Sequence, residues 1–241
     1  NGIDDMGMEL ISIVNCTSPT DQRPPQWLNA CWWKGRMWYG QVDRAGRLTS
    51  MARHLDIMAH EITHGVIDTS SKLVYRDQSG ALNESFADVL GTIVANWWKA
   101  PDREDTSTWD WRIGAGLLEG GLPLRDFSDP ASLGHPAHMD DYLDTGADSG
   151  GVHTNSNIHN VAIYNLLTAT RADGTAILRV RDVALLAYLT LVQLTRQATF
   201  ADARVKMVDV ANVYFSAEPE RMSEVVAAIE DAYDDVGITE S

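Results

Sequence analysis

The segment "HEITH" holds the residues of this chain that are best suited to chemistry. His60 and His64 are four residues apart, and Glu61 follows the first of them. Residues four apart lie on one face of a helix, so both imidazoles can bind the same metal ion. A zinc ion can activate a water molecule, and a neighbouring carboxylate can accept its proton. The segment therefore predicts a zinc site with Glu61 as a general base.

A second acidic segment could complete this site. Catalytic zinc takes three protein ligands and one open position, commonly two imidazoles and one carboxylate. Glu84 follows His64 after nineteen intervening residues, and Asp88 lies one helical turn further on. Glu84 could be the third ligand, while Asp88 could accept the second ring N–H of a ligand histidine. Taken alone, these two residues could equally be ordinary surface acids.

A helix must position the histidines. Ser50 can cap a helix that runs to about Asp68. On a helical wheel the histidines lie opposite an apolar stripe, which we expect to face the core. The stripe comprises Met51, Leu55, Met58, Ile62 and Val66. This separation argues against histidines packed in the core, whereas a solvated face stays open as an alternative.

The acidic segment also reads as a helix. Ser79-Gly80 predicts a turn before a helix over about 82–98, on which Glu84 and Asp88 again oppose the apolar side. Gly91 and Ala95 lie on the acidic side, so another helix could approach closely there.

Length, composition and charge limit the classes of protein to which the chain can belong. The chain has 241 residues, of which 44% are hydrophobic, enough for one large or two modest domains. Its net charge of -15 is spread along the chain and argues against nucleic acids and anionic membranes as partners. The longest apolar run, 183–194, is shorter than the roughly 20 residues that span a bilayer, so we expect a buried helix.

The remaining pattern predicts an α+β fold. Strand-like stretches cover 8–14 and 36–42, and a loop-rich stretch covers 101–157. Further helices are expected at about 158–171, 180–196 and 200–215, with a last one ending near Val236. Thr199 and Asp202 resemble a capping box. We expect a β-rich part with the histidine helix over 1–69 and a mainly helical domain over 70–241.

Several longer motifs carry a family resemblance. They are "LVYRDQSGALNESFADVLG" at 73–91, "LPLRDFSDP" at 122–130, "DSGGVHTNSNIHNVAIY" at 148–164 and "ATFADARVKMVDVA" at 198–211. Together with "HEITH" they resemble the thermolysin-like neutral zinc metallopeptidases, over almost the whole chain. The resemblance implies a cleft between a β-rich and a helical part, with the "HEITH" helix at its floor. It also implies a secreted endopeptidase that cleaves on the amino side of medium or large apolar residues.

The resemblance assigns roles residue by residue. It implies zinc ligands His60, His64 and Glu84, supported by Asp88 and Asn83, with Glu61 as the general base. His153 and Tyr75 would donate to the negatively charged oxygen of the reaction intermediate, and Asp148 would orient His153. Substrate would contact Asn29, Ala30, Trp32 and Arg125. An apolar pocket would be formed by Ile57, Leu124, Met51, Ile113 and Leu117.

The sequence also departs from the family pattern. The positions of the family's double calcium site are Asp56, Ala95, Asp110, Arg112 and Ala115. Only two of these are acidic, so we expect no double calcium site and a pairing of Arg112 with Asp56 or Asp110 instead. The N-terminal part looks shortened, and a disulfide between Cys16 and Cys31 is slightly favoured in an extracellular setting. A propeptide or an inhibitor would be a further partner, and a catalytically silent zinc-binding module is the competing functional hypothesis.

Overall fold

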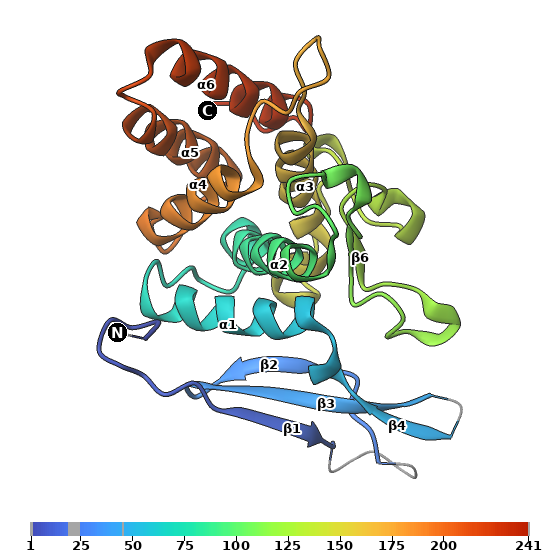
Figure 1. Cartoon of the computed structure of the whole chain (residues 1–241). Coiled ribbons are helices and arrows are strands. Elements are labelled where there is room, and N and C mark those ends of the chain that lie inside the picture. The colour runs from blue at the N-terminus through green and yellow to red at the C-terminus, as the bar shows by residue number, and fades with distance from the viewer. Residues whose placement is uncertain (1, 19–24, 45, 241) are drawn as a thin grey trace.

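The computed structural model describes residues 2–18, 25–44 and 46–240, and confirms an α+β fold (Figure 1). The strands of its main sheet are β1 (Ser12–Cys16), β2 (Ala30–Trp33), β3 (Arg36–Arg44) and β4 (Arg47–Ser50). The helices are α1 (Leu55–Thr69), α2 (Asp77–Lys99), α3 (Asp148–Thr168), α4 (Val180–Gln193), α5 (Phe200–Tyr214) and α6 (Pro219–Asp234). Two short strands, β5 (Arg112–Ile113) and β6 (Arg125–Asp126), pair in the intervening loop region.

The main sheet is built around β3. β1 pairs with it in parallel, whereas β2 and β4 pair with it antiparallel. Among the described strands β2 pairs with β3 alone, so its other edge is free. The strands expected at 8–14 and 36–42 correspond to β1 and β3, with β1 displaced by a few residues.

Helix α1 lies between the sheet and α2 (Figure 1). Its histidine face is buried against α2, while Leu55, Met58, Ile62 and Val66 are only half-buried. Met58, Ile62 and Val66 nevertheless pack against the core and Met51 is fully buried, so the apolar stripe faces the core as expected, and the polar face is buried as well. The wheel could not show that α2 would bring matching polar groups to the opposite face.

Close contact between α1 and α2 depends on Gly91. A Cβ at this position would lie 2.7 Å from the backbone oxygen of Asp56 and 3.4 Å from the backbone nitrogen of His60. Any larger residue would push the two helices apart, which matches the close approach expected from the sequence.

Helix α2 begins earlier than predicted. It starts at Asp77, so Ser79-Gly80 lies within its first turn and is not a turn before it. A Cβ at Gly80 would lie 2.5 Å from the Val152 side chain, and the Ser79 hydroxyl donates to the Val74 and Arg76 carbonyls. These small residues thus serve packing and local hydrogen bonding, which single-sequence turn signals do not distinguish.

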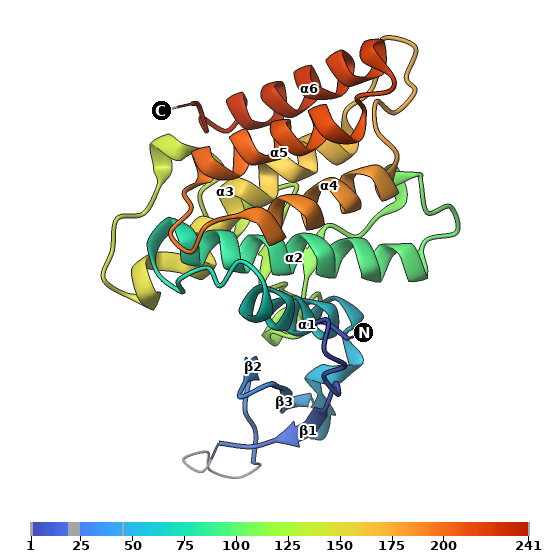
Figure 2. The ribbon, with the colours of Figure 1, turned by 90° about the vertical axis from the view of Figure 1, so that its left-hand side faces the viewer.

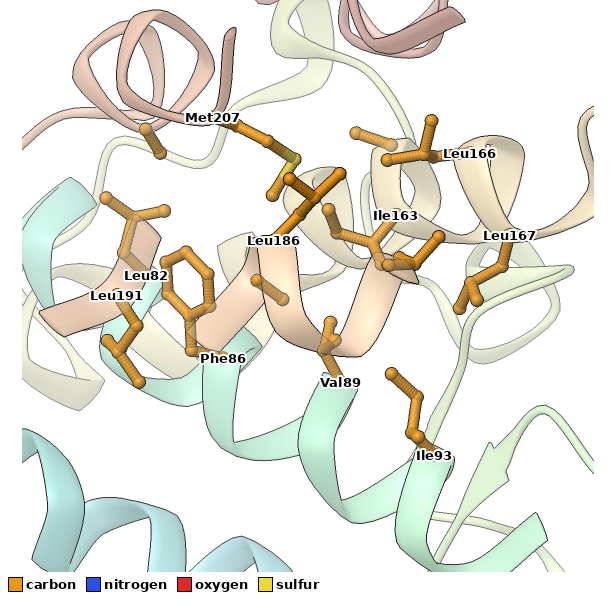
Figure 3. Packing of buried hydrophobic residues seen from close by; sticks show 14 of the residues in the cluster. Leu82, Phe86, Val89, Ile93, Ile163, Leu166, Leu167, Leu186, Leu191 and Met207 are labelled. Carbon is orange, nitrogen blue, oxygen red and sulfur yellow. The ribbon is translucent and has the colours of Figure 1, made fainter. Parts of the chain in front are cut away.

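The helical part stacks α4, α5 and α6 beside α2 and α3 (Figures 1 and 2). Figure 3 shows the core between them, in which Phe86 and Val89 of α2 meet side chains of α3 and α4. The loop-rich stretch ends sooner than expected, because α3 begins at Asp148 with left-handed residues over 149–151. The capping box of Thr199 and Asp202 is present, as predicted. No helix of the described residues is both long and apolar enough to cross a membrane.

The two cysteines are free in this structure, contrary to the disulfide expectation. Cys16 is opposite Gly40 and Cys31 is opposite Trp38, so the cysteines sit on the two strands that flank β3. Two strand spacings amount to about 9.5 Å, beyond the roughly 7 Å between Cα atoms that a disulfide can bridge.

Candidate metal centre

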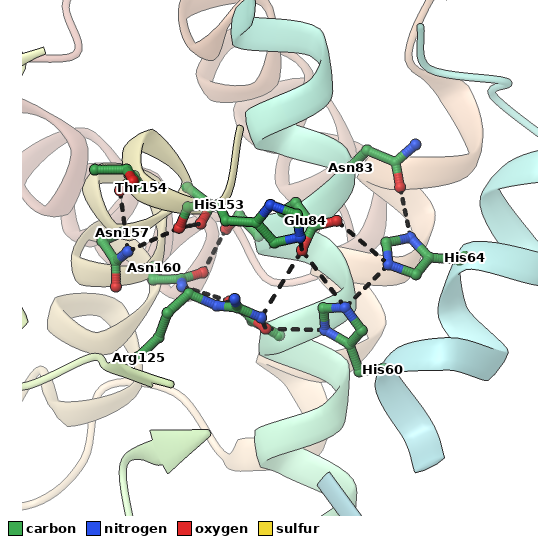
Figure 4. A network of polar contacts seen from close by, with 12 residues as sticks. His60, His64, Asn83, Glu84, Arg125, His153, Thr154, Asn157 and Asn160 are labelled. Atoms are coloured by element: carbon green, nitrogen blue, oxygen red, sulfur yellow. Dashed lines mark hydrogen bonds and ion pairs between the residues drawn. The ribbon is translucent and has the colours of Figure 1, made fainter. Parts of the chain in front are cut away.

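Three side chains converge where α1 packs on α2 (Figure 4). His60 and His64 project from successive turns of α1, and Glu84 faces them from α2. One ligand atom from each lies within 4.8 Å of the others. The carboxylate oxygens of Glu84 are each 3.5 Å from a ring Nε2. This spacing leaves room for a single cation among the three.

Polar contacts at Nδ1 of each ring indicate where the protons of the two rings lie. Nδ1 of His64 is 2.7 Å from Oδ1 of Asn83, whose amide nitrogen donates to the Leu73 carbonyl. Nδ1 of His60 is 2.9 Å from Oδ1 of Asp88. Both oxygens can only accept, so both Nδ1 atoms carry the proton and both Nε2 atoms present lone pairs.

The donor set fits a zinc ion. The two Nε2 atoms are 2.9 Å apart, a separation at which facing lone pairs repel unless a cation lies between them. Burial and the neighbouring His60 lower the pKa of His64, so protonation does not relieve the contact at neutral pH. Oε2 of Glu84 is buried and accepts no hydrogen bond among the described residues. Two imidazoles and one carboxylate are a set typical of catalytic zinc.

A buried ion pair supports the centre. Arg125 donates from Nε and Nη2 to the two carboxylate oxygens of Asp88 at 2.5 and 2.6 Å. Burial opposes ionisation, but Arg125 and His60 lower the pKa of Asp88 well below its usual range. Burial likewise opposes ionisation of Glu84, yet the histidines around it lower its pKa to about 2. Both carboxyls are therefore anionic at neutral pH.

Glu61 lies beside the convergent ligands. The backbone N–H of Trp32 donates to its carboxylate, whereas Oε2 accepts no hydrogen bond among the described residues. Burial raises the pKa of Glu61 to about 7. A carboxyl group that titrates near neutrality and has one unbonded oxygen can accept a proton from a nearby water molecule and return it.

Two further donors face Glu84 from the other side of the centre. The Tyr75 hydroxyl donates to Oε1 of Glu84 at 2.5 Å and lies 3.2 Å from Nε2 of His153. Asp148 accepts both from Nδ1 of His153 at 2.8 Å and from its backbone N–H at 3.0 Å. The carboxylate can fold back onto the ring because α3 begins with positive φ at Asp148 and Ser149.

A cavity of about 920 Å³ opens onto these groups. Its lining includes Asn29, Ala30 and Trp32 from the β2 segment as well as His60, Glu61, His64, Tyr75, Glu84 and His153. The free edge of β2 thus runs along the cavity. An extended peptide could add to this edge through main-chain hydrogen bonds.

A smaller pocket of about 290 Å³ adjoins the same centre. Ile57, Leu124 and Met51 contribute to its lining, as the sequence suggested, and Arg125 lies there too. Ile113 and Leu117, which are also buried in the core, are not among its lining residues. His135 also lines this pocket and was not predicted, since nothing in its local sequence marks a loop histidine as part of a site.

The region expected to lack calcium contains one exposed ion pair. Arg112 donates from Nε and Nη2 to Asp110 at 2.7 and 3.1 Å. Asp56 takes no part in it; this buried carboxylate accepts the backbone N–H of Gly114 at 2.6 Å. The alternative pairing of Arg112 with Asp56 is therefore wrong, because a loop amide occupies that carboxylate.

Two imidazoles and a carboxylate on packed helices, beside a free strand edge, are typical of the zinc metallopeptidase class. The chain belongs to the thermolysin metallopeptidase family: residues 1–68 match its catalytic domain and residues 71–238 match its alpha-helical domain.

Named relatives come from several bacteria. The chain is 38% identical over 211 residues to an extracellular elastase of Staphylococcus epidermidis, covering 86% of this chain and 37% of that protein. It is 34% identical over 244 residues to bacillolysin of Bacillus cereus, covering 99% of this chain and 40% of that protein. Thus the chain spans about two fifths of the length of these relatives.

A solved structure is also similar. The precursor of protealysin, a metalloproteinase from Serratia proteamaculans, superposes with a TM-score of 0.77 at 30% sequence identity. The match covers 99% of this chain and 72% of that one.

Proposed function

We propose that this chain is the catalytic part of a secreted zinc-dependent endopeptidase. The observation that carries the proposal is the pair of facing Nε2 lone pairs of His60 and His64, closed by an unbonded oxygen of Glu84 and flanked by Glu61. When bound, zinc would polarise the scissile carbonyl and make a water molecule more acidic. The relatives named extracellular elastase and bacillolysin support secretion and proteolysis.

Residues of the chain would transfer the proton, stabilise the transition state and orient the metal ligands. Glu61 would accept a proton from the attacking water and deliver it to the departing amine, for which its pKa of about 7 is suited. His153 and Tyr75 would donate hydrogen bonds to the oxygen that becomes negative in the transition state. Asp148 would keep the His153 ring oriented, because it accepts from Nδ1. Asp88 and Asn83 would hold the ligand histidines in the tautomer that exposes Nε2.

Peptide substrates would bind along the free edge of β2. Asn29, Ala30 and Trp32 would pair with the extended backbone, and Nη1 of Arg125, which makes no hydrogen bond among the described residues, would hold a substrate carbonyl. The pocket beside Ile57 and Leu124 favours Leu, Phe or Ile after the cleaved bond. Equal cleavage before Asp and before Leu in a peptide library would refute this specificity.

Three further features belong to the proposal. The chain divides into residues 1–69 and 70–241, with the cleft between these parts. We expect no double calcium site around Arg112, a proposal supported by its ion pair with Asp110. A propeptide would cover the cleft before activation, a suggestion supported by the similarity to the protealysin precursor.

The central experiment is hydrolysis of casein by the purified full chain. We expect activity that 1,10-phenanthroline abolishes and added zinc restores. Glu61→Gln should bind about one zinc per chain and lose at least 100-fold in kcat, in line with loss of a general base. Glu220→Gln, the same change of side chain at an exposed residue of α6, is the matched control. One zinc per chain without cleavage of any peptide would instead identify a silent zinc-binding module.

A further inference from the structure

A continuous set of hydrogen bonds leads from α6 to the candidate metal centre. Tyr233 of α6 contacts His159 of α3, which contacts Ser85 of α2. Ser85 contacts Asn160 of α3, and Asn160 contacts Asp88 of α2. All five side chains are fully buried. We call these five residues the Tyr233–Asp88 relay; Figure 4 shows its Asn160 end beside Arg125.

The direction of each hydrogen bond follows from Asp88. Its carboxylate already accepts two hydrogen bonds from Arg125, and it can only accept from Asn160 at 2.9 Å. The amide nitrogen of Asn160 must therefore face Asp88, so its Oδ1 faces the Ser85 hydroxyl at 2.7 Å. The Ser85 hydroxyl therefore donates its single proton to this oxygen.

This donation fixes the tautomer of His159. The hydroxyl oxygen of Ser85 lies 2.7 Å from Nδ1 of His159 and must accept there, so Nδ1 carries the proton. The ring is neutral, because burial lowers its pKa to about 3 and no charged group contacts it. Nε2 therefore accepts from the Tyr233 hydroxyl at 2.8 Å. Every donor in the relay points toward Asp88.

We propose that the Tyr233–Asp88 relay positions the His60 ligand, so that a hydroxyl on α6 sets the affinity of the zinc site. Oδ1 of Asp88 lies 2.9 Å from Nδ1 of His60, and Asn160 is the only described partner of Asp88 besides Arg125 and that ring. A one-directional chain polarises each member and holds the carboxylate at a fixed angle. The relay residues are positioning residues that act through Asp88. This inference rests on the proposed zinc function, whereas the tautomer of His159 can be tested without it.

The alternative is that His159 and Tyr233 are a satisfied polar pair that stabilises the core and nothing more. Variants of His159 separate the two. His159→Asn places an amide nitrogen near the Nδ1 position and can still donate to Ser85, whereas His159→Leu removes both nitrogens at similar volume. Tyr233→Phe removes only the first donor. Tyr142→Phe is the control, because Tyr142 packs on Phe200 as His159 does but lies outside the relay.

The test measures the zinc dissociation constant of each full-length variant by chelator competition at pH 7.5. We expect Tyr233→Phe and His159→Leu to weaken zinc binding by about 10-fold, the lower end of the effect of outer-shell partners. His159→Asn keeps the hydrogen bond to Ser85 but loses the one from Tyr233, so it should weaken zinc binding as much as Tyr233→Phe does, and Tyr142→Phe should not change it. Urea unfolding of each apoprotein reports stability separately. Unchanged zinc binding in folded Tyr233→Phe would overturn the proposal, even if that variant unfolds more easily.

A second measurement does not depend on zinc binding or folding of the variants. Imidazole ¹⁵N NMR of the wild-type chain should show His159 protonated on Nδ1, and a proton on Nε2 would overturn the proposal. If the wild type bound no zinc, the proposed function would fail while this tautomer would still be measurable. If zinc bound and casein were not cleaved, the affinity series would still decide the relay.

Discussion

Acid should destabilise this protein through His159, a group far from the surface. Burial lowers the pKa of this imidazole to about 3 in the folded chain, whereas an unfolded chain titrates near 6.5. The unfolded state therefore binds the proton first as pH falls. The contribution to stability is fully present above pH 6.5 and is lost progressively down to about pH 3. Between pH 7.5 and 5.0 the loss amounts to about 2 kcal/mol of unfolding free energy.

The measurement compares the wild type with His159→Asn. Both chains are unfolded in urea at pH 7.5 and 5.0, with chelator present so that zinc release does not contribute. Asparagine cannot titrate but can keep the hydrogen bond to Ser85, so the acid-induced loss should be smaller in the variant by about 2 kcal/mol. An identical loss in both chains would refute the reasoning, because it would mean that His159 is already protonated in the folded state or reaches water.

The remaining predictions concern the α1–α2 contact and the metal. Gly91→Ala should lower the unfolding free energy by about 1–3 kcal/mol and weaken zinc binding, since its Cβ would meet Asp56. Gly146→Ala is the control, because nothing lies within 4 Å of a Cβ at that position. Equal effects of the two substitutions would contradict this prediction. Removing zinc should lower the thermal midpoint, and restoring it should recover that midpoint, as calorimetry can check. Calorimetry should detect no tight calcium binding near Arg112; tight binding there would show that the ion pair does not replace the ions.

The sequence was most informative where spacing alone constrains geometry. His60 and His64 must share a helix face, and Glu84 completes a donor set that chemistry limits to few combinations. Helix periodicity and ligand chemistry do not depend on the tertiary structure. For the same reason the capping box at Thr199 and Asp202 could be predicted without knowledge of the fold.

Prediction failed where one residue type serves two purposes. Ser79-Gly80 looks like a turn, but these residues are small because Val152 packs against α2 at that point. The wheel of α1 correctly separated the polar from the apolar face, but it could not show that the polar face would be buried as well. A helix covered on two sides has two buried faces, and a single sequence does not reveal that a neighbour will supply matching charges.

The relay could not be predicted for a further reason. Ser85, His159 and Tyr233 come from three different helices. The direction of the hydrogen bonds between them depends on which donor atom faces which acceptor atom. His159 by itself reads as an ordinary histidine in an apolar helix. Only the three-dimensional arrangement shows that Asp88 imposes one proton direction on all of them.

The order in which the chain contributes to the centre has a consequence for how the protein matures. The ligands His60, His64 and Glu84 lie within a helical hairpin of neighbouring residues, whereas Arg125, His153 and Tyr233 come from much later segments. Contacts between close segments form faster than contacts that close long loops. We expect a folding chain to gather its metal ligands before it acquires the groups that orient substrate and stabilise charge. If the proposed function holds, a half-folded molecule could capture zinc without being able to cleave its own unfolded neighbours.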